Sequence, residues 1–491
     1  MPCLRCPHLH FAAILFGALA ASRAQTAPGR FVILAGAVST LWAQSPTPPP
    51  SGSFDHREAF RAASNGWQVA GELNGDPRRD APFNLRAGTG LLVANSAATA
   101  AEPLITPTEF GDLELELEFL LGPKAEATVW LQGRYPLNLN TGSAGVAPLA
   151  DATRAPGLWQ RLRVEFRAPQ FDSAGRKTAP ARFVRVVLNS FPIHVNVAAD
   201  TPAPGAIFPN DAPTGALVLT ATRGAVAIRG MKANPPSPAA AVAGPAAKAK
   251  GKQPAGKAAK QPANIISIPV DVSDTIVLQR GFVPYEPVKR LYAISVGHPA
   301  GVHYAYDLST GALLRAWRGG FIDAGEMWEG RSANQWAKPT GPALTLNARP
   351  TVARIDGAGN SPWPTEPDPL SVSNGYAVER DGQPVFLSKF GTLSIRDRIA
   401  PADRRTLTRS LTFTGTIPTG PTTFVLLARA HRIAPQPNAS GFVVGDRDYY
   451  LDLPNPLPAA PEIRSDGDFQ LLVIPVTNAA LSQPITYSLA W

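Results

Sequence analysis

The stretch LITPTEFGDLELELEFLLGPKAEATVWLQGRY, residues 104–135, decides the fold that we predict for this chain. Leucine or phenylalanine alternates with glutamate between residues 113 and 119. Further on, Val129 and Leu131 alternate with three other side chains: Trp130, Gln132 and Arg134. A period of two is typical of β-strands that place one face on a core and the other toward solvent or a ligand. We therefore predict two strands, each with an apolar inner face and a polar outer face.

The predicted outer faces carry groups that suit a sugar. An indole stacks on the C–H face of a pyranose, and carboxylate, amide and guanidinium groups form paired hydrogen bonds with neighbouring hydroxyls. The candidate sugar-binding residues are Trp130, Gln132, Arg134, Tyr135 and Asn138. The candidate acid or base residues are Glu116 and Glu118. The alternative is an ordinary amphipathic sheet whose polar face is only solvated.

Composition favours a large, turn-rich β protein. The 491 residues exceed the usual size of a single domain, which predicts two domains. The 51 prolines and 42 glycines are too many for a helical protein, and no long stretch has the 3.6-residue period of a helix. We predict an all-β chain in which a jelly-roll sandwich is followed by a disordered linker and a second β-sandwich.

Composition also divides the chain into four parts. Residues 1–44 are predicted to be a signal peptide region, 45–234 the first β domain, 235–263 a linker and 264–491 a second β-sandwich of unknown function. The linker is rich in alanine, proline and lysine. Such a segment buries too little apolar surface to offset the entropy of the chain, so we expect it to be disordered.

The N-terminal region has the features of an export signal. Phe11–Ala21 is an apolar run that is followed by small residues at Ser22 and Ala24. A second apolar run covers Phe31–Ala43, and the sequence leaves open which run is the signal core. Both are too short for a comfortable membrane span. We therefore predict a periplasmic or secreted protein without a stable membrane span.

The net charge of +9 does not indicate a nucleic-acid partner. Three arginines of the signal region and five lysines of the linker account for all but one of these charges, because neither segment contains an acid. The rest of the chain is nearly neutral and offers no basic face for a polyanion. The predicted partner is a carbohydrate; partner proteins at the cell surface stay open.

No cofactor is predicted from the sequence. The two cysteines, Cys3 and Cys6, precede either cleavage point, so the mature chain would lack thiolate ligands and disulfides. No histidine-based motif has the spacing of a metal site. A divalent metal stays open but has no support.

Five short motifs of the first domain resemble those of one known family. They are FGDLELELEF at 110–119, LQGRY at 131–135, GLWQ at 157–160, FRAPQFD at 166–172, and Ile193 with His194. In these motifs the first domain resembles the 3-keto-disaccharide hydrolase domain, which is related in fold to the concanavalin-like jelly rolls of family 16 glycoside hydrolases. The resemblance implies action on a 3-keto sugar, whose ketone acidifies the neighbouring C–H bond so that acid/base groups can cleave the glycoside.

Three departures from the family pattern concern the groups that would do this chemistry. Family members usually have Asn-Ser-Gly before the second strand, Tyr-Glu-x-Gln after it and a His-Gly pair before the last strand. In this sequence the corresponding places hold residues 126–128, Tyr135-Pro136-Leu137-Asn138, and Thr222-Arg223. Pro136 and Thr222 cannot replace a carboxylate and an imidazole.

The sequence therefore leaves three functions open. The first is an exported hydrolase that acts on 3-keto-glycosides through the concave sheet of the first domain, and the second is a noncatalytic glycan-binding protein with a degenerate active site. The third is a cell-surface scaffold. The second domain resembles a β-rich module that accompanies such domains in secreted bacterial proteins, and this resemblance implies no mechanism.

Overall fold

The computed structural model describes residues 52–54, 56–61, 65–96, 100–236, 266–285, 289–328, 335–356, 361–436, 440–454 and 456–491. The predicted signal region lies outside these residues, as does the predicted linker beyond residue 236. In the described ranges nearly all regular structure is strand, and the α-helix α1 has only four residues, Gly325–Trp328. The short 3-10 helices are Arg57–Ala59 and Asn478–Leu481. The all-β prediction is confirmed.

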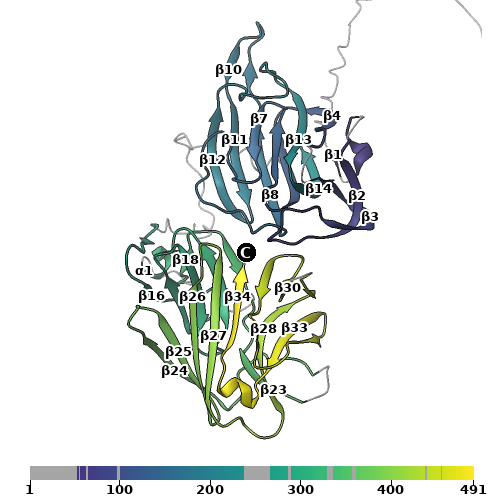
Figure 1. Cartoon of the computed structure of the whole chain (residues 1–491). Helices are drawn as coiled ribbons and strands as arrows, with labels where there is room; N and C mark the ends of the chain where they lie inside the picture. The colour runs from purple at the N-terminus through teal and green to yellow at the C-terminus, as the bar shows by residue number, and fades with distance from the viewer. Residues whose placement is uncertain are drawn as a thin grey trace, which may run out of the picture. The chain divides into compact units, whose positions relative to one another are not determined.

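The first domain is built from two antiparallel sheets, and Figure 1 shows their strands in purple to teal. Sheet A contains, in spatial order, β12 (Phe191–Ala199), β11 (Ala181–Leu188), β8 (Trp159–Arg167), β5 (Leu113–Leu121), β14 (Ala225–Asn234), β3 (Asn84–Asn95) and β2 (Trp67–Asn74), while β1 (Gly52–Ser53) pairs with β14. Sheet B contains β4 (Leu104–Phe110), β13 (Gly215–Arg223), β6 (Glu126–Leu131) and β7 (Tyr135–Asn138). A small hairpin joins β9 (Gln170–Phe171) to β10 (Lys177–Ala179).

The alternation in β5 places its apolar side chains in the core between the two sheets. Leu113, Leu115, Leu117 and Phe119 are at most 2% exposed, and all four belong to one cluster with residues of sheet B. The glutamates between them are only half-buried. Sheet B contributes Val129 and Leu131 to the same cluster. The predicted inward and outward faces of β5 are therefore confirmed.

The second domain has four further sheets, and Figure 1 shows the run from β24 to β34 as neighbouring strands. The longest sheet is β24 (Ser371–Val378), β25 (Pro384–Phe390), β26 (Leu393–Pro401), β27 (Thr406–Gly415), β34 (Ile485–Ala490), β31 (Tyr449–Asp452), β30 (Gly441–Val444) and β29 (Ile433–Pro435). The others are β16 (Val277–Arg280), β17 (Ala293–Gly297), β18 (Val302–Asp307), β19 (Leu313–Arg318) and β22 (Ala343–Thr345); β23 (Val352–Ile355), β28 (Thr422–Ala430), β33 (Phe469–Pro475) and β32 (Glu462–Asp466); and β15 (Pro269–Val270), β20 (Ile322–Asp323) and β21 (Lys338–Pro339).

The two largest hydrophobic clusters fall on either side of the predicted linker. One draws its buried members from residues 54–233 and the other from residues 294–491. The part of the chain that the structure describes contains no helix with the length and apolar character of a membrane span.

Candidate functional site

The seven candidate residues do not come together on one surface. Glu116 and Glu118 lie on β5 between core leucines, so they face outward from sheet A. Trp130 lies on β6 between Val129 and Leu131, so it faces outward from sheet B. Because the two sheets pack on a shared core, these outward faces lie on opposite sides of the sandwich. A site that combines both glutamates with Trp130 is therefore not formed.

The outer face of sheet A, which we call the glutamate face, carries a network of cross-strand ion pairs. A carboxylate oxygen of Glu116 lies 2.6 Å from the Arg163 guanidinium. Glu118 is bound by two guanidiniums, those of Arg161 at 2.7 Å and Arg229 at 2.6 Å. Opposite charges on neighbouring strands stabilise a sheet modestly when they are solvated. This network explains the glutamate alternation without requiring a catalytic role.

The glutamate face also forms an open hollow of about 770 Å³. Its charged lining residues are Glu114, Glu116, Glu118, Arg161, Arg163, Glu165, Arg185 and Lys232. A hollow of this size accommodates a small saccharide. Guanidinium N–H groups and carboxylate oxygens can hydrogen-bond to sugar hydroxyls there, but no aromatic side chain contributes to its lining.

The outer face of sheet B, which we call the Trp130 face, is chemically different. In the register of the sheet, Trp130 lies between Pro136 of β7 and Val218 of β13. The next row joins Thr128 to Asn138 and Thr220, and the Trp130 indole N–H donates to the Thr220 hydroxyl at 3.3 Å. The face thus combines an indole with hydroxyl and amide groups.

Two positions that depart from the family pattern, Pro136 and Thr222, lie on this same face. Pro136 is the neighbour of Trp130 on β7. Thr222 lies near the end of β13, where its side chain is exposed and its hydroxyl donates to the Glu126 carbonyl at 3.4 Å. The places that the resemblance assigns to the family's usual carboxylate and imidazole are therefore held on the Trp130 face by a pyrrolidine ring and a hydroxyl.

Gln132 and Arg134 are buried and fasten a neighbouring segment instead of facing solvent. Gln132 is fully buried, and its amide N–H donates to the carbonyls of Phe110 at 3.0 Å and Pro213 at 3.1 Å. The Arg134 guanidinium donates to the carbonyls of Asn210 at 2.5 Å and Thr214 at 3.1 Å. Both side chains thus hold residues 208–214 against the turn between β6 and β7.

Tyr135 is also a structural anchor. Its ring is 1% exposed, and its hydroxyl donates to the Asp211 carboxylate at 2.5 Å. Burial, together with this contact to Asp211, raises the pKa of Tyr135 far above its usual value. The second oxygen of Asp211 accepts from the Lys177 ammonium group at 2.7 Å. Asp211 and Lys177 were not among the predicted site residues, and the only sequence signal near them is the Asp-Ala-Pro-Thr-Gly turn at 211–215.

Asn138 is half-buried at the end of β7, where it organises the loop that follows. Its side-chain carbonyl accepts from the backbone N–H groups of Asn140 and Thr141, each at 3.0 Å. His194 supports the same loop from beneath, because its Nε2 lies 2.6 Å from the Gly142 carbonyl oxygen and its ring is 1% exposed. Trp130 and Asn138 are thus the candidate ligands that belong to the Trp130 face.

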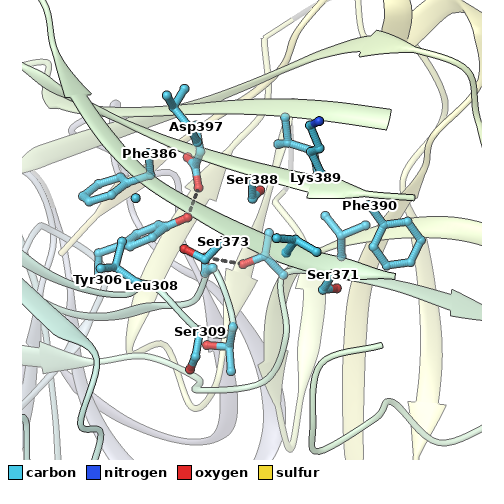
Figure 2. A pocket seen from close by; sticks show the side chains of 18 of the residues that line it. Tyr306, Leu308, Ser309, Ser371, Ser373, Phe386, Ser388, Lys389, Phe390 and Asp397 are labelled. Atoms are coloured by element: carbon cyan, nitrogen blue, oxygen red, sulfur yellow. Dashed lines mark hydrogen bonds between the residues drawn. The ribbon is translucent and has the colours of Figure 1, made fainter. Parts of the chain in front are cut away.

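The second domain contains a cavity whose lining includes Tyr306 and Asp397, both labelled in Figure 2. The Tyr306 hydroxyl donates to Asp397 at 2.9 Å, and the Arg409 guanidinium donates to the same carboxylate at 2.6 Å. Burial disfavours the guanidinium charge, but contact with Asp397 raises the pKa of Arg409 well above its usual value. The cavity measures about 40 Å³, which suits a few water molecules and not a pyranose ring.

The described ranges contain no cluster of metal ligands. No group of three or more His, Cys, Asp and Glu side chains is placed there to hold a metal ion.

The first domain is a jelly-roll β-sandwich. Each of its two sheets has an outer face that carries polar side chains. Residues 61–233 match the model of the family described as the 3-keto-alpha-glucoside-1,2-lyase-like domain. The match supports a carbohydrate-active protein. No curated protein matches the chain.

Part of this chain is similar to two solved structures from Parabacteroides distasonis ATCC 8503, both provisionally described as glycosyl hydrolases. One is 18% identical, with the alignment covering 39% of this chain and 93% of that chain at a TM-score of 0.24. The other is 13% identical, with coverage of 36% and 92% and a TM-score of 0.23.

Proposed function

We propose that this protein is an exported glycan-binding protein whose first domain takes a neutral sugar on the Trp130 face. The observation that carries the proposal is the row formed by Val218, Trp130 and Pro136, with Asn138 in the next row. An indole beside amide and hydroxyl groups provides a stacking surface and hydrogen-bond partners for a pyranose. The side chains in these two rows contain no carboxylate or imidazole.

The proposal that this protein is exported rests on the sequence alone. The apolar runs at Phe11–Ala21 and Phe31–Ala43 support it, and both lie outside the described residues. The lack of cysteine after Cys6 is compatible with an oxidising compartment but does not select one.

The second candidate function is hydrolysis or elimination of 3-keto-glycosides, which the family match over residues 61–233 favours. In this version the substrate occupies the hollow of the glutamate face, and Glu116 or Glu118 exchanges protons with it. Both carboxylates already engage arginines, so a substrate would have to share them. A free carboxylate near each reacting atom would be the simpler arrangement for acid/base catalysis.

The deciding experiment mixes the full chain with 3-keto-glucosides and with their unoxidised parents. Release of the leaving group measures turnover, and titration calorimetry measures binding. We expect saturable binding of at least one sugar without release. Release from the keto substrates would instead assign the family chemistry to this chain, and the absence of both signals would contradict both functions.

Two variants assign the sugar to a face. Trp130→Ala should weaken binding about tenfold or more, since it removes the stacking surface. Tyr292→Ala is the matched control, because Tyr292 is an aromatic residue of the second domain that is 66% exposed. Unchanged affinity in Trp130→Ala would exclude the Trp130 face.

A further inference from the structure

Several buried polar atoms without a hydrogen-bond partner occur close to Tyr285 in the second domain. Among the described residues these atoms are Nε of Arg290, Nε of Arg315, Nη1 of Arg349 and Oδ2 of Asp307. A buried N–H group that has lost its water and found no acceptor destabilises the fold, so such groups in a native protein call for an explanation. Three of these four atoms belong to guanidiniums, which suggests a missing acceptor.

Contacts place two of the arginines against one short segment. The Arg290 guanidinium lies 5.8 Å from the centre of the Tyr285 ring. Another N–H of Arg315, which projects from β19, donates to the Pro284 carbonyl. Arg290 and Arg315 therefore meet at residues 284–285, although they come from different parts of the chain.

The third arginine belongs to a loop that is tied to the same tyrosine. The Tyr285 hydroxyl donates to the Leu346 carbonyl, three residues before Arg349. Burial raises the pKa of Tyr285, and the charges of Arg290, Arg315, Arg429 and Arg349 all oppose that rise. The hydrogen bond from Tyr285 to Leu346 therefore ties the loop that carries Arg349 to the segment that Arg290 and Arg315 contact.

The charges near Tyr285 do not balance. Among the described residues, Asp307 is the acid in contact with the group; its carboxylate lies 3.8 Å from Arg290 and its side chain is 1% exposed. Burial lowers the pKa of Arg315, and no carboxylate is among its contacts in the described ranges. Arg429 is paired with Asp466 at 2.6 Å. Among the described residues, the other three guanidiniums of the group therefore face one carboxylate.

We propose that Arg290, Arg315 and Arg349 hold an oxyanion beside Tyr285, in the form of a carboxylate, sulfate or phosphate group. Guanidiniums present paired N–H donors whose geometry matches such groups. One oxyanion supplies several acceptors at once, whereas a chloride ion cannot match that planar pattern. The Arg290 side chain is 25% exposed, so a ligand can reach the group from solvent. The site is independent of the sugar site of the first domain.

The test uses the full chain with sodium sulfate, sodium phosphate, sodium acetate and methyl glucuronoside as separate probes, each balanced to equal ionic strength with sodium chloride. A ligand that binds the folded state raises the melting temperature in a saturable way. We expect at least one oxyanion to do so beyond the chloride control, and the responding probe identifies the source of the group. Equal melting temperatures in all four and in chloride would overturn the proposal.

Four variants make the assignment specific. Arg315→Gln and Arg349→Gln should each lower the affinity for the responding probe about tenfold or more. Two variants are used so that the test stays valid if one of them fails to fold. Arg176→Gln is the matched control, because this arginine is 82% exposed and pairs with Asp172 in a turn of the first domain. Glu286 lies outside the described residues; if only Glu286→Gln binds the probes, the chain's own carboxylate fills the site and the proposal is wrong.

Discussion

At the scale of single residues, the ion pairs of the glutamate face differ in how strongly they should stabilise the domain. Glu118 is 25% exposed and has two guanidinium partners, whereas Glu116 is 47% exposed and pairs with the Arg163 guanidinium at 2.6 Å. Less solvent screening and a second partner both strengthen an ion pair. The two residues therefore form a matched pair for mutation.

Glu118→Gln should lower the free energy of unfolding by about 1 kcal/mol, and Glu116→Gln by less than about 0.5 kcal/mol. Urea titrations of the full chain measure both values. Equal losses would show that screening and partner number do not control these pairs. If 3-keto-glucosides are turned over, loss of turnover in folded Glu118→Gln would place catalysis on the glutamate face.

At the scale of elements, the segment at 208–214 depends on the turn between β6 and β7. Gly133 has a φ of +65°, and a Cβ at this position would lie 2.4 Å from the Phe208 ring. Gly133→Ala should therefore cost about 2 kcal/mol of stability through strain and displacement of Phe208. Weaker sugar binding is also expected if the segment borders the Trp130 face.

Gly175→Ala is the control for this variant. Gly175 has a φ of +76°, but no atom lies within 4 Å of the position where its Cβ would be. It should show the backbone cost alone, about 1 kcal/mol. Identical melting temperatures for the two variants would exclude the contact with Phe208 as the cause.

A second element with a testable role is the short strand β15, which Asp323 fastens. The Asp323 carboxylate accepts from the backbone N–H groups of Ile268 and Gly325, each at 2.8 Å, and from the Ser267 hydroxyl at 2.7 Å. Burial alone would raise the pKa of Asp323, but these donors lower it below its usual value. The ionised form is therefore favoured in the folded state.

The sign of the resulting pH dependence follows from that lowered pKa. Asp323 contributes stability above the unfolded pKa of about 3.9, and this contribution is lost as the pH falls through the lower folded pKa. Asp323→Asn should lower the free energy of unfolding at pH 7 by about 1–3 kcal/mol, with the difference shrinking below about pH 4. A difference that is constant from pH 7 to pH 3 would contradict this assignment.

At the scale of the whole molecule, the two large clusters predict two folding units. Their members come from residues 54–233 and from residues 294–491. Five lysines between them, at positions 248–260, are sites for trypsin. Limited trypsin treatment should give two resistant fragments, each with a cooperative melting transition. Degradation of either fragment to small peptides would show that its cluster cannot sustain a fold alone.

Local periodicity was enough to predict the strands but not the composition of a site. The alternation at 113–119 fixed which side chains of β5 are buried, because a strand has a strict period of two. It could not show that β5 pairs with β14 while β6 joins the other sheet, since these pairings involve residues about a hundred positions apart in the chain. The glutamates and Trp130 were therefore expected on one surface.

The outward position expected for Gln132 followed from extending the alternation past the end of a strand. The strand β6 ends at Leu131, and the next two residues, Gln132 and Gly133, have φ values of +54° and +65°. A left-handed turn redirects side chains, so the period of two no longer holds. The amide of Gln132 consequently lies inside the domain, on the carbonyls of Phe110 and Pro213.

The two-sided construction of the sandwich has a consequence for evolution. Stability is supplied by the shared core and supplemented by the ion pairs of the glutamate face, whereas Trp130, Pro136 and Thr222 project from the other side. Substitutions on the Trp130 face therefore change the stability of the domain little, and loss of stability is what limits most mutations. A lineage can exchange the chemistry of one surface, gaining or discarding proton-transfer groups, while it inherits the scaffold unchanged.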